Sequence, residues 1–343
     1  MIKRWRIGLL GVVVTALAIY FLLSQVDVTR LASALTTARY IYLLPCIVLL
    51  VAGLVTRALR WQVLLSGGLP LKRAFSILNV TYLVNGLLPL RIGELARAYL
   101  ATRSEPPVAV FKSVSTIITE RLLDLLAVIV LLTLALSAGP LPDQLRAFGL
   151  VTGPIALVGF LVLVLLAKQR QRSERLLAWL MERIPALRRL NVMAFAAHFL
   201  DGLAPLTRLS TLAQALGWTV LSWALSVAAG YVLMFAFYER ADWAVTFMYI
   251  AAAAFAVAVP AVPGNVGPYE AAIVLALSTM DAHLLQPLGE ASATAAAFAL
   301  VVHGVNVAVY AVTGIIGFIQ EGVSLAQLSR GVQDIRHHTR QEM

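Results

Sequence analysis

Charged residues are scarce in this chain of 343 amino acids. Asp, Glu, Lys and Arg make up 13% of the sequence and apolar residues 60%, whereas soluble domains average about 25% charged and about 45–50% apolar. A soluble enzyme is therefore excluded. Cysteine is almost absent as well. Cys46 stands alone in an apolar run, so this chain by itself cannot build a disulfide framework or a thiolate metal site.

Signature motifs of common catalytic sites are also missing. The sequence contains no G-x-S-x-G motif, no P-loop and no zinc-binding pattern. Its five histidines show no clear metal-ligand spacing with carboxylates. We therefore expect no catalytic residue, no metal site and no cofactor. A membrane-embedded enzyme that acts on a lipid-linked substrate stays open as an alternative.

Long apolar runs are what the chain has in abundance. A transmembrane helix takes about 20 residues. Six runs of suitable length are present, at residues 5–25, 41–60, 114–138, 147–167, 211–237 and 291–319. The first run is too long for the apolar core of a signal peptide, and no clear cleavage site follows it, so we expect a retained span. Two further apolar segments, 74–100 and 243–280, are interrupted by Pro and Gly.

Basic residues outnumber acidic ones by 27 to 17, which gives a formal net charge of +10. If the N-terminus is cytoplasmic, all Lys and Arg residues except Arg30, Arg39, Arg146 and Arg240 fall on the cytoplasmic side, as the positive-inside rule requires. The excess therefore reports topology, and we expect no nucleic-acid partner. Arg is far commoner than Lys, which hints at a GC-rich bacterial genome. We expect a multi-pass protein of the bacterial cytoplasmic membrane with both termini in the cytoplasm.

One sizeable polar stretch, residues 168–210, is expected to be inserted in a transmembrane domain of residues 1–320. Apolar residues recur in it at helical spacing with arginines on other faces, which is typical of amphipathic helices on a membrane surface. Docking of a cytoplasmic partner on this region is the alternative. Residues 321–343 form a polar cytoplasmic tail, and a homo-oligomer stays open.

Ionisable side chains cost about 2.5–3.5 kcal/mol each inside a membrane, so clusters of them are candidate functional sites. The first cluster lies in the segment 74–100, where Gly86, Pro89 and Gly93 disfavour a continuous helix. Its polar members are Asn85, Arg91, Glu94 and Arg97. Glu94 can pair with either arginine, which leaves one guanidinium free to bind phosphate. Ordinary ion pairs on a cytoplasmic loop are the alternative.

The second cluster lies at the start of the span 114–138. Glu120 and Asp124 share a helical face there, and Arg121 can reach Asp124 at the i, i+3 spacing. Pairing of these carboxylates with the arginines of the first cluster would satisfy the charges of both. A proton-linked or cation-linked role for the carboxylates is the alternative.

A pair of arginines closes the span 41–60. Arg57 and Arg60 lie three residues apart on one helical face, at a position typical of side chains that extend from a helix end to the lipid headgroups. We expect both to anchor the chain at the headgroup region, and their shared face would also allow contact with a lipid phosphate.

Helix-breaking residues define the third cluster, within the segment 243–280. They are Pro260, Pro263, Gly264, Gly267 and Pro268, and Glu270 follows them. Non-helical backbone is tolerated at membrane depth only where protein or water covers it. A helix that begins after such a break points its positive N-terminal end at the opening, as broken helices do when they bind anionic groups. A turn outside the membrane is the alternative.

The first and third clusters have the same form. In both PLRIGE and PGNVGPYE, an apolar half-span meets a Pro/Gly break and a Glu opens a second half-span. The charge distribution places their entrances on opposite sides of the membrane. Corresponding broken segments of opposite sense indicate an inverted repeat with a central binding site. The predicted fold class is therefore an all-α polytopic membrane protein with about six full spans and two broken or re-entrant helix pairs.

Three strings carry a resemblance to a known family. VNGLLPLRIGELARAYL, TERLLDLL and VPGNVGPYEA resemble, in order and spacing, the signatures of the lysylphosphatidylglycerol synthase transmembrane region, or flippase-like, membrane protein family. The resemblance covers about residues 5–320. Asn265 stands where the family commonly has a second Gly. The cytosolic aminoacyl-transfer domain of bifunctional members has no counterpart here, so the resemblance implies a stand-alone module.

The resemblance implies a module that moves a membrane phospholipid or glycolipid between leaflets through a polar cavity. Carried over by motif position, with the break that lines the other side, the binding candidates are Asn85, Arg91, Glu94, Arg97, Glu120, Arg121, Asp124, Pro263, Gly264, Gly267 and Glu270. A membrane enzyme or an accessory subunit of a lipid-modifying system remains the alternative.

Overall fold

The computed structural model describes residues 27–88, 91–138, 143–183, 203–258, 263–279, 289–324 and a few isolated positions between and after them. Apart from one isolated bridge between Tyr238 and Pro287, these residues contain no β-structure. The α-helices are α2 (Val28–Thr37), α3 (Leu43–Leu64), α4 (Leu71–Leu87), α5 (Gly93–Thr102), α6 (Val110–Ala138), α7 (Asp143–Lys168), α8 (Arg170–Arg183), α11 (Leu209–Met234), α12 (Trp243–Ala258), α13 (Pro268–Ser278) and α14 (Ala291–Glu321). Three short 3-10 helices accompany them: η1 (Tyr40–Tyr42), η3 (Ala204–Thr207) and η4 (Pro263–Asn265).

Five helical stretches of the described chain are long and apolar enough to cross a membrane. They are Tyr40–Leu64, Lys112–Ala138, Val151–Lys168, Leu209–Met234 and Ala291–Glu321. Each coincides with a run predicted from the sequence, and the all-α polytopic fold is confirmed. The remaining predicted span, 5–25, lies outside the described residues. The chain is therefore a multi-pass membrane protein.

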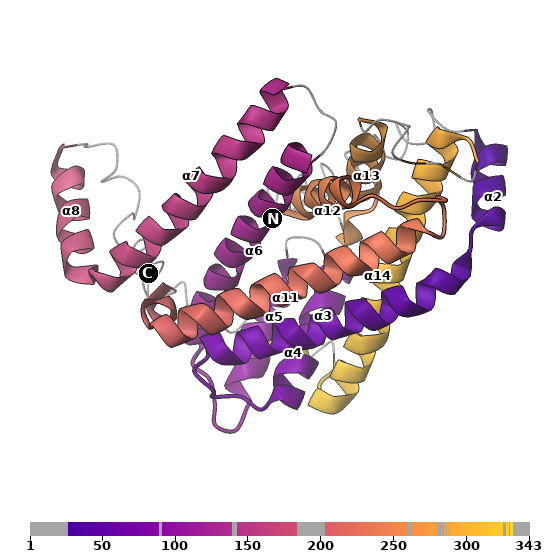
Figure 1. Cartoon of the computed structure of the whole chain (residues 1–343). Helices are drawn as coiled ribbons and strands as arrows, with labels where there is room; N and C mark the ends of the chain where they lie inside the picture. Colours follow the sequence, from indigo (N-terminus) through magenta and orange to yellow (C-terminus); the bar gives the residue numbers. More distant parts are fainter. Residues whose placement is uncertain are drawn as a thin grey trace, which may run out of the picture.

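The long helices pack in pairs along their lengths. Helices α3 and α11 lie side by side, α14 packs along α4, and α6 packs against both α7 and α12 (Figure 1). On one side of the molecule, α2 packs against the start of α14, where Arg30 of α2 contacts Glu290 (Figure 1). These pairings bring the C-terminal half of α3, the hairpin of α4 and α5 and the first half of α6 together around one polar region.

Both interrupted segments are broken helices, as the sequence predicts. Helix α4 ends at Leu87 and α5 starts at Gly93, while α12 ends at Ala258 and α13 starts at Pro268. With 10 residues in α5 and 11 in α13, each second helix is roughly 15 Å long at about 1.5 Å per residue. That is half of a hydrocarbon core of about 30 Å, so neither short helix crosses the membrane alone.

The two breaks meet in space. The side chain of Arg91 reaches from the first break to the last turn of α12, where its Nη2 donates a hydrogen bond of 2.6 Å to the carbonyl oxygen of Val257. At the second break, a Cβ built on Gly264 would lie 3.3 Å from the carbonyl oxygen of Gly86. The expectation that the two broken elements face one another is therefore met, whereas the inverted repeat stays a prediction.

Helix α8 lies in the polar stretch 168–210 and follows α7 after a one-residue turn. Its residues 184–202 lie outside the described part of the chain. Where the chain is described again, Leu203 and Leu206 are buried in an apolar cluster with Phe160 of α7 and Ala215 of α11. The C-terminal end of this stretch is therefore anchored in the helix bundle.

Candidate functional site

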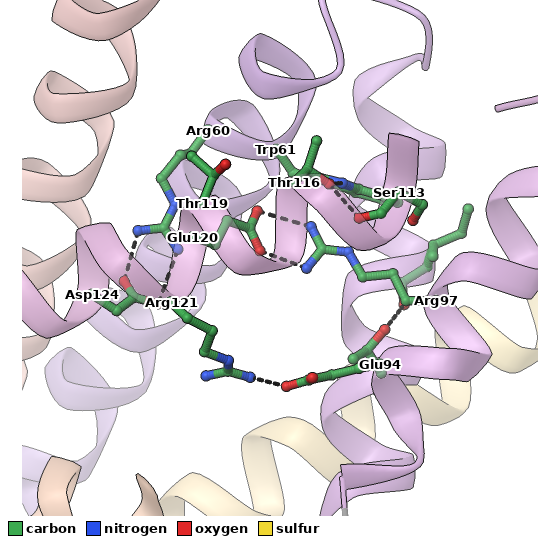
Figure 2. Close-up of polar contacts among 12 residues, drawn as sticks. Arg60, Trp61, Glu94, Arg97, Ser113, Thr116, Thr119, Glu120, Arg121 and Asp124 are labelled. Atoms are coloured by element: carbon green, nitrogen blue, oxygen red, sulfur yellow. Dashed lines mark hydrogen bonds and ion pairs between the residues drawn. The ribbon is translucent and has the colours of Figure 1, made fainter. Parts of the chain in front are cut away.

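Eight charged side chains gather where α3, α5 and α6 meet, and we call this group the charged layer. Its members are Arg57, Arg60, Arg91, Glu94, Arg97, Glu120, Arg121 and Asp124. Figure 2 shows six of them joined by ion pairs that connect the three helices. Five of the eight lie on α3 and α6, which are candidate membrane spans.

Arg97 and Glu120 form the most enclosed pair of the layer. The guanidinium donates two hydrogen bonds to the carboxylate, at 2.6 and 2.9 Å, and the two side chains are only 5% and 9% exposed. The guanidinium also stacks on the ring of Trp61, 3.9 Å from its centroid. A two-pronged charge-assisted contact with an aromatic cover holds both side chains in fixed positions. Arg97 therefore ties α5 to α6 and α3.

Arg60 and Asp124 form a second pair, between α3 and α6, in which Arg60 is buried and Asp124 is 27% exposed. Nη1 and Nη2 of Arg60 lie 2.7 and 3.2 Å from the two carboxylate oxygens. Asp124 also accepts a hydrogen bond of 3.1 Å from the indole of Trp223, and Arg60 donates one of 3.2 Å to Thr219. All four groups thus connect α3, α6 and α11. We call Arg97–Glu120 and Arg60–Asp124 the inner pairs.

The enclosure of Arg60 corrects one expectation from the sequence. Arg60 is 2% exposed, so it does not extend to the headgroups as the sequence position suggested. Arg121 can reach Asp124 by its spacing in the sequence, but in the structure it contacts Glu94, and Arg60 contacts both oxygens of Asp124. Helix α11 packs antiparallel to α3 and brings Thr219 to Arg60. The sequence of the span 41–60 alone does not predict this partner.

Glu94 has two arginine partners, and these three side chains form what we call the outer triad. Arg121 of α6 donates a hydrogen bond to its Oε1 (Figure 2), and Nη1 of Arg91 lies 3.8 Å from the same atom. The exposed fractions of Arg121, Glu94 and Arg91 are 47, 26 and 23%. The outer triad is therefore open to the surroundings, unlike Arg97–Glu120.

The second break is built around the carboxylate of Glu270. Its Oε2 accepts a hydrogen bond of 2.7 Å from the backbone N–H of Gly267, which caps α13, and its Oε1 lies 2.5 Å from Nδ1 of His303 on α14. Glu270 and His303 are both buried, and the ring of Tyr269 lies against the imidazole. Glu270 thus joins the broken helix to the last span.

Comparison with known protein families identifies the family of this chain. The family model of the lysylphosphatidylglycerol synthase TM region matches residues 8–314. The chain belongs to this family. No curated protein matches the sequence. Membership shows a membrane protein connected with lipids, and it extends over both breaks and the whole charged layer.

The family motif of the first break contains Asn85, whose role in the structure is local. Its Oδ1 accepts a hydrogen bond of 2.8 Å from the backbone N–H of Gly93, which satisfies a free donor at the start of α5. A Cβ on Gly93 would lie 2.3 Å from the carbonyl oxygen of Thr81, so only glycine permits this contact between α4 and α5. Asn85 therefore fixes the hairpin that carries Arg91, Glu94 and Arg97.

At the second break, Asn265 stands where the resemblance implies a second glycine, and the structure explains why asparagine is tolerated there. Asn265 has φ +55°, next to Gly264 at +63°, and Gly267 has +95°. Asparagine enters this left-handed region more readily than other residues with a side chain. Pro263 begins the 3-10 turn η4 that these residues continue. The break therefore keeps its backbone path with one glycine fewer.

Several residues of the site escape a motif-based reading of this family. The sequence does not predict that Trp61, Thr219 and Trp223 complete the inner pairs, or that His303 contacts Glu270. Isolated Trp and Thr residues in apolar spans carry no recognisable signal. In the described part of the chain, no group of three or more His, Cys, Asp and Glu residues is arranged to hold a metal.

Proposed function

We propose that this family member moves a lipid with a polar, phosphate-bearing headgroup between the leaflets of a bacterial cytoplasmic membrane. The observation that carries the proposal is the outer triad. It places two arginines and one carboxylate, all part-exposed, beside the point where the two broken helices meet. Ionisable groups within a membrane domain are costly and mark substrate pathways, and facing broken helices are typical of transporter binding sites.

The outer triad has the chemistry that a headgroup requires. Arg91 and Arg121 can each offer two donors in one plane to phosphate oxygens, and Glu94 can accept from an amine or hydroxyl of the same headgroup. In this proposal the triad faces a water-filled cavity, where ion pairs contribute only about 0–1 kcal/mol. A headgroup can therefore replace them without a large loss of stability.

The inner pairs have a different part in this proposal. Arg97 is bound on both prongs by Glu120 and covered by Trp61, so it is a positioning residue and leaves phosphate binding to Arg91 and Arg121. Rocking of the α4–α5 hairpin against η4 and α13 would expose the outer triad to each leaflet in turn. The contact of Arg91 with Val257 lies between these two bodies and would break and re-form during the movement.

Leaflet exchange in liposomes tests the proposal. Purified protein is reconstituted with a fluorescent phosphatidylglycerol, and the inner-leaflet fraction is followed by quenching from outside. We expect exchange faster than in protein-free vesicles, and a loss of at least about tenfold with Arg91→Ala, since each charge-assisted contact is worth about 1.5–3 kcal/mol. Arg103→Ala, at an exposed arginine after α5, is the matched control. Exchange no faster than in empty vesicles would reject translocation.

The orientation of the chain is part of the same proposal. The distribution of Lys and Arg supports an orientation with both termini in the cytoplasm. Arg30 and Glu290 then lie together on the outer side. This orientation can be checked with single cysteines introduced at Arg30 and at Arg175. Intact cells are treated with a thiol reagent that does not cross membranes. We expect labelling at residue 30 alone.

A further inference from the structure

Arg57 differs from every other arginine of the charged layer. Each of the other four arginines lies within 4.0 Å of a carboxylate oxygen. No carboxylate of the described residues lies within that distance of Arg57. Its partners are neutral hydroxyls: it donates a hydrogen bond of 3.5 Å to Ser226, which is at the limit for such a bond, and it also interacts with the phenols of Tyr82 and Tyr310. Arg57 therefore carries a positive charge that contact with an acid does not neutralise.

Two tyrosines border this guanidinium. Its Cζ lies 5.9 Å from the ring centroid of Tyr82 on α4, and the rings of Tyr82 and Tyr310 on α14 stack with centroids 5.0 Å apart. Both phenols are close enough to interact electrostatically with Arg57. Asp124 is an acid that interacts electrostatically with it, and Arg60 contacts both oxygens of Asp124.

The charge balance of the charged layer also favours a binding site for an anion. The layer holds five arginines and three carboxylates, so its pairs leave a positive excess in a region where unpaired charge is expensive. Arg57, Tyr82, Tyr310 and Ser226 are all part-exposed, so a ligand can reach them. A guanidinium fork flanked by phenol hydroxyls, with no competing carboxylate in contact, is suited to phosphate oxygens.

We infer that Arg57, Tyr82 and Tyr310 form a subsite for the phosphate group of an anionic lipid. This inference rests on the proposed function and adds to it a binding position on α3, α4 and α14, made of residues other than those of the outer triad. Arg57 neutralises the phosphate, and the two phenols donate hydrogen bonds to its oxygens. The aromatic faces cover the site from the apolar side.

Equilibrium binding to the purified full chain in detergent tests the subsite without any translocation step. The probes are dioleoylphosphatidylglycerol, dioleoylglycerol, which lacks the phosphate, and inorganic phosphate as competitor. We expect the phospholipid to bind, the diacylglycerol to bind at least about tenfold more weakly, and inorganic phosphate to leave the bound lipid in place at a hundredfold excess. Displacement by inorganic phosphate at the lipid's own concentration would overturn a lipid ligand.

Variants locate the binding. Arg57→Gln is expected to weaken phospholipid binding at least about tenfold, and Tyr82→Phe and Tyr310→Phe each several-fold. The phenylalanine variants keep the stacked rings and so stay informative if Arg57→Gln does not fold. Arg103→Gln is the control. Unchanged binding in Arg57→Gln, or in both phenylalanine variants, would overturn the subsite. Binding that depends on Arg57, in a protein that shows no leaflet exchange, would keep the subsite and reject translocation.

Discussion

The inner pairs and the outer triad contain the same residue types and differ in what surrounds them. Arg97 and Glu120 are only 5 and 9% exposed and Arg97 packs on Trp61, whereas Arg121 and Glu94 are 47 and 26% exposed; Figure 2 shows the two pairs. A buried pair loses several kcal/mol when one partner is removed, because the other charge is stranded. An exposed pair loses about 0–1 kcal/mol. Identical chemistry therefore supports the fold in one place and leaves binding capacity in the other.

Removal of Arg97 should give the largest effect and tests the inner side of this comparison. Arg97→Met leaves the Glu120 carboxylate buried without its partner, so we expect the free energy of unfolding to fall by about 3–5 kcal/mol. SDS-induced unfolding in mixed micelles measures it. The double variant Arg97→Met with Glu120→Leu removes both charges and should recover a large part of the loss. A double variant as unstable as the single one contradicts a structural role for the pair.

Glu270 extends the comparison to the second break, and its replacement should have an intermediate effect on the free energy of unfolding. Glu270→Ala removes both the cap on Gly267 and the partner of His303, and we expect a loss of about 2–4 kcal/mol from the two hydrogen bonds together. Glu270→Gln keeps an oxygen acceptor for one of the two hydrogen bonds, so its free energy of unfolding should fall by about half as much. The same unfolding assay measures both. Equal losses in the two variants would argue that the carboxylate does not cap α13.

Arg121 tests the outer side of the comparison. Its side chain is 47% exposed, so Arg121→Gln should change the free energy of unfolding by no more than about 1 kcal/mol. Leaflet exchange in liposomes should nevertheless fall at least about tenfold, because the triad loses a phosphate ligand. If stability falls as far as in Arg97→Met while exchange persists, the distinction between inner pairs and outer triad is wrong.

Asn265 is expected to give the smallest effect. Asn265→Gly relaxes a residue at φ +55° but adds freedom to the unfolded chain, so the two contributions should cancel to within about 0.5 kcal/mol. Asn265→Val puts a β-branched side chain into the left-handed region and should cost about 1–2 kcal/mol. Unfolding midpoints in detergent separate these outcomes. A neutral valine variant would show that the break does not need this backbone conformation.

Much of the fold follows from local patterns. The five described spans and the two breaks lie where apolar runs and Pro/Gly positions predict them, because a helix in lipid must satisfy its own backbone and fails where Pro and Gly prevent it. The sequence predicts the partners of the charged residues less completely. Pairing of Glu120 with an arginine of the first cluster was among the expectations, but the contacts of Asp124 with Arg60 and of Glu94 with Arg121 were not.

The sequence by itself determined the membrane architecture, the broken helices and the acidic and basic residues that had to find partners. Only the tertiary structure decided which partners they found. A charged side chain in a span must be paired, and that requirement can be read from the chain. Which acid lies opposite Arg60, and that none lies opposite Arg57 in the described residues, depends on how α3 packs against α6 and α11. Helix packing, a property of many side chains at once, divides five similar arginines into those buried in ion pairs and those that stay part-exposed.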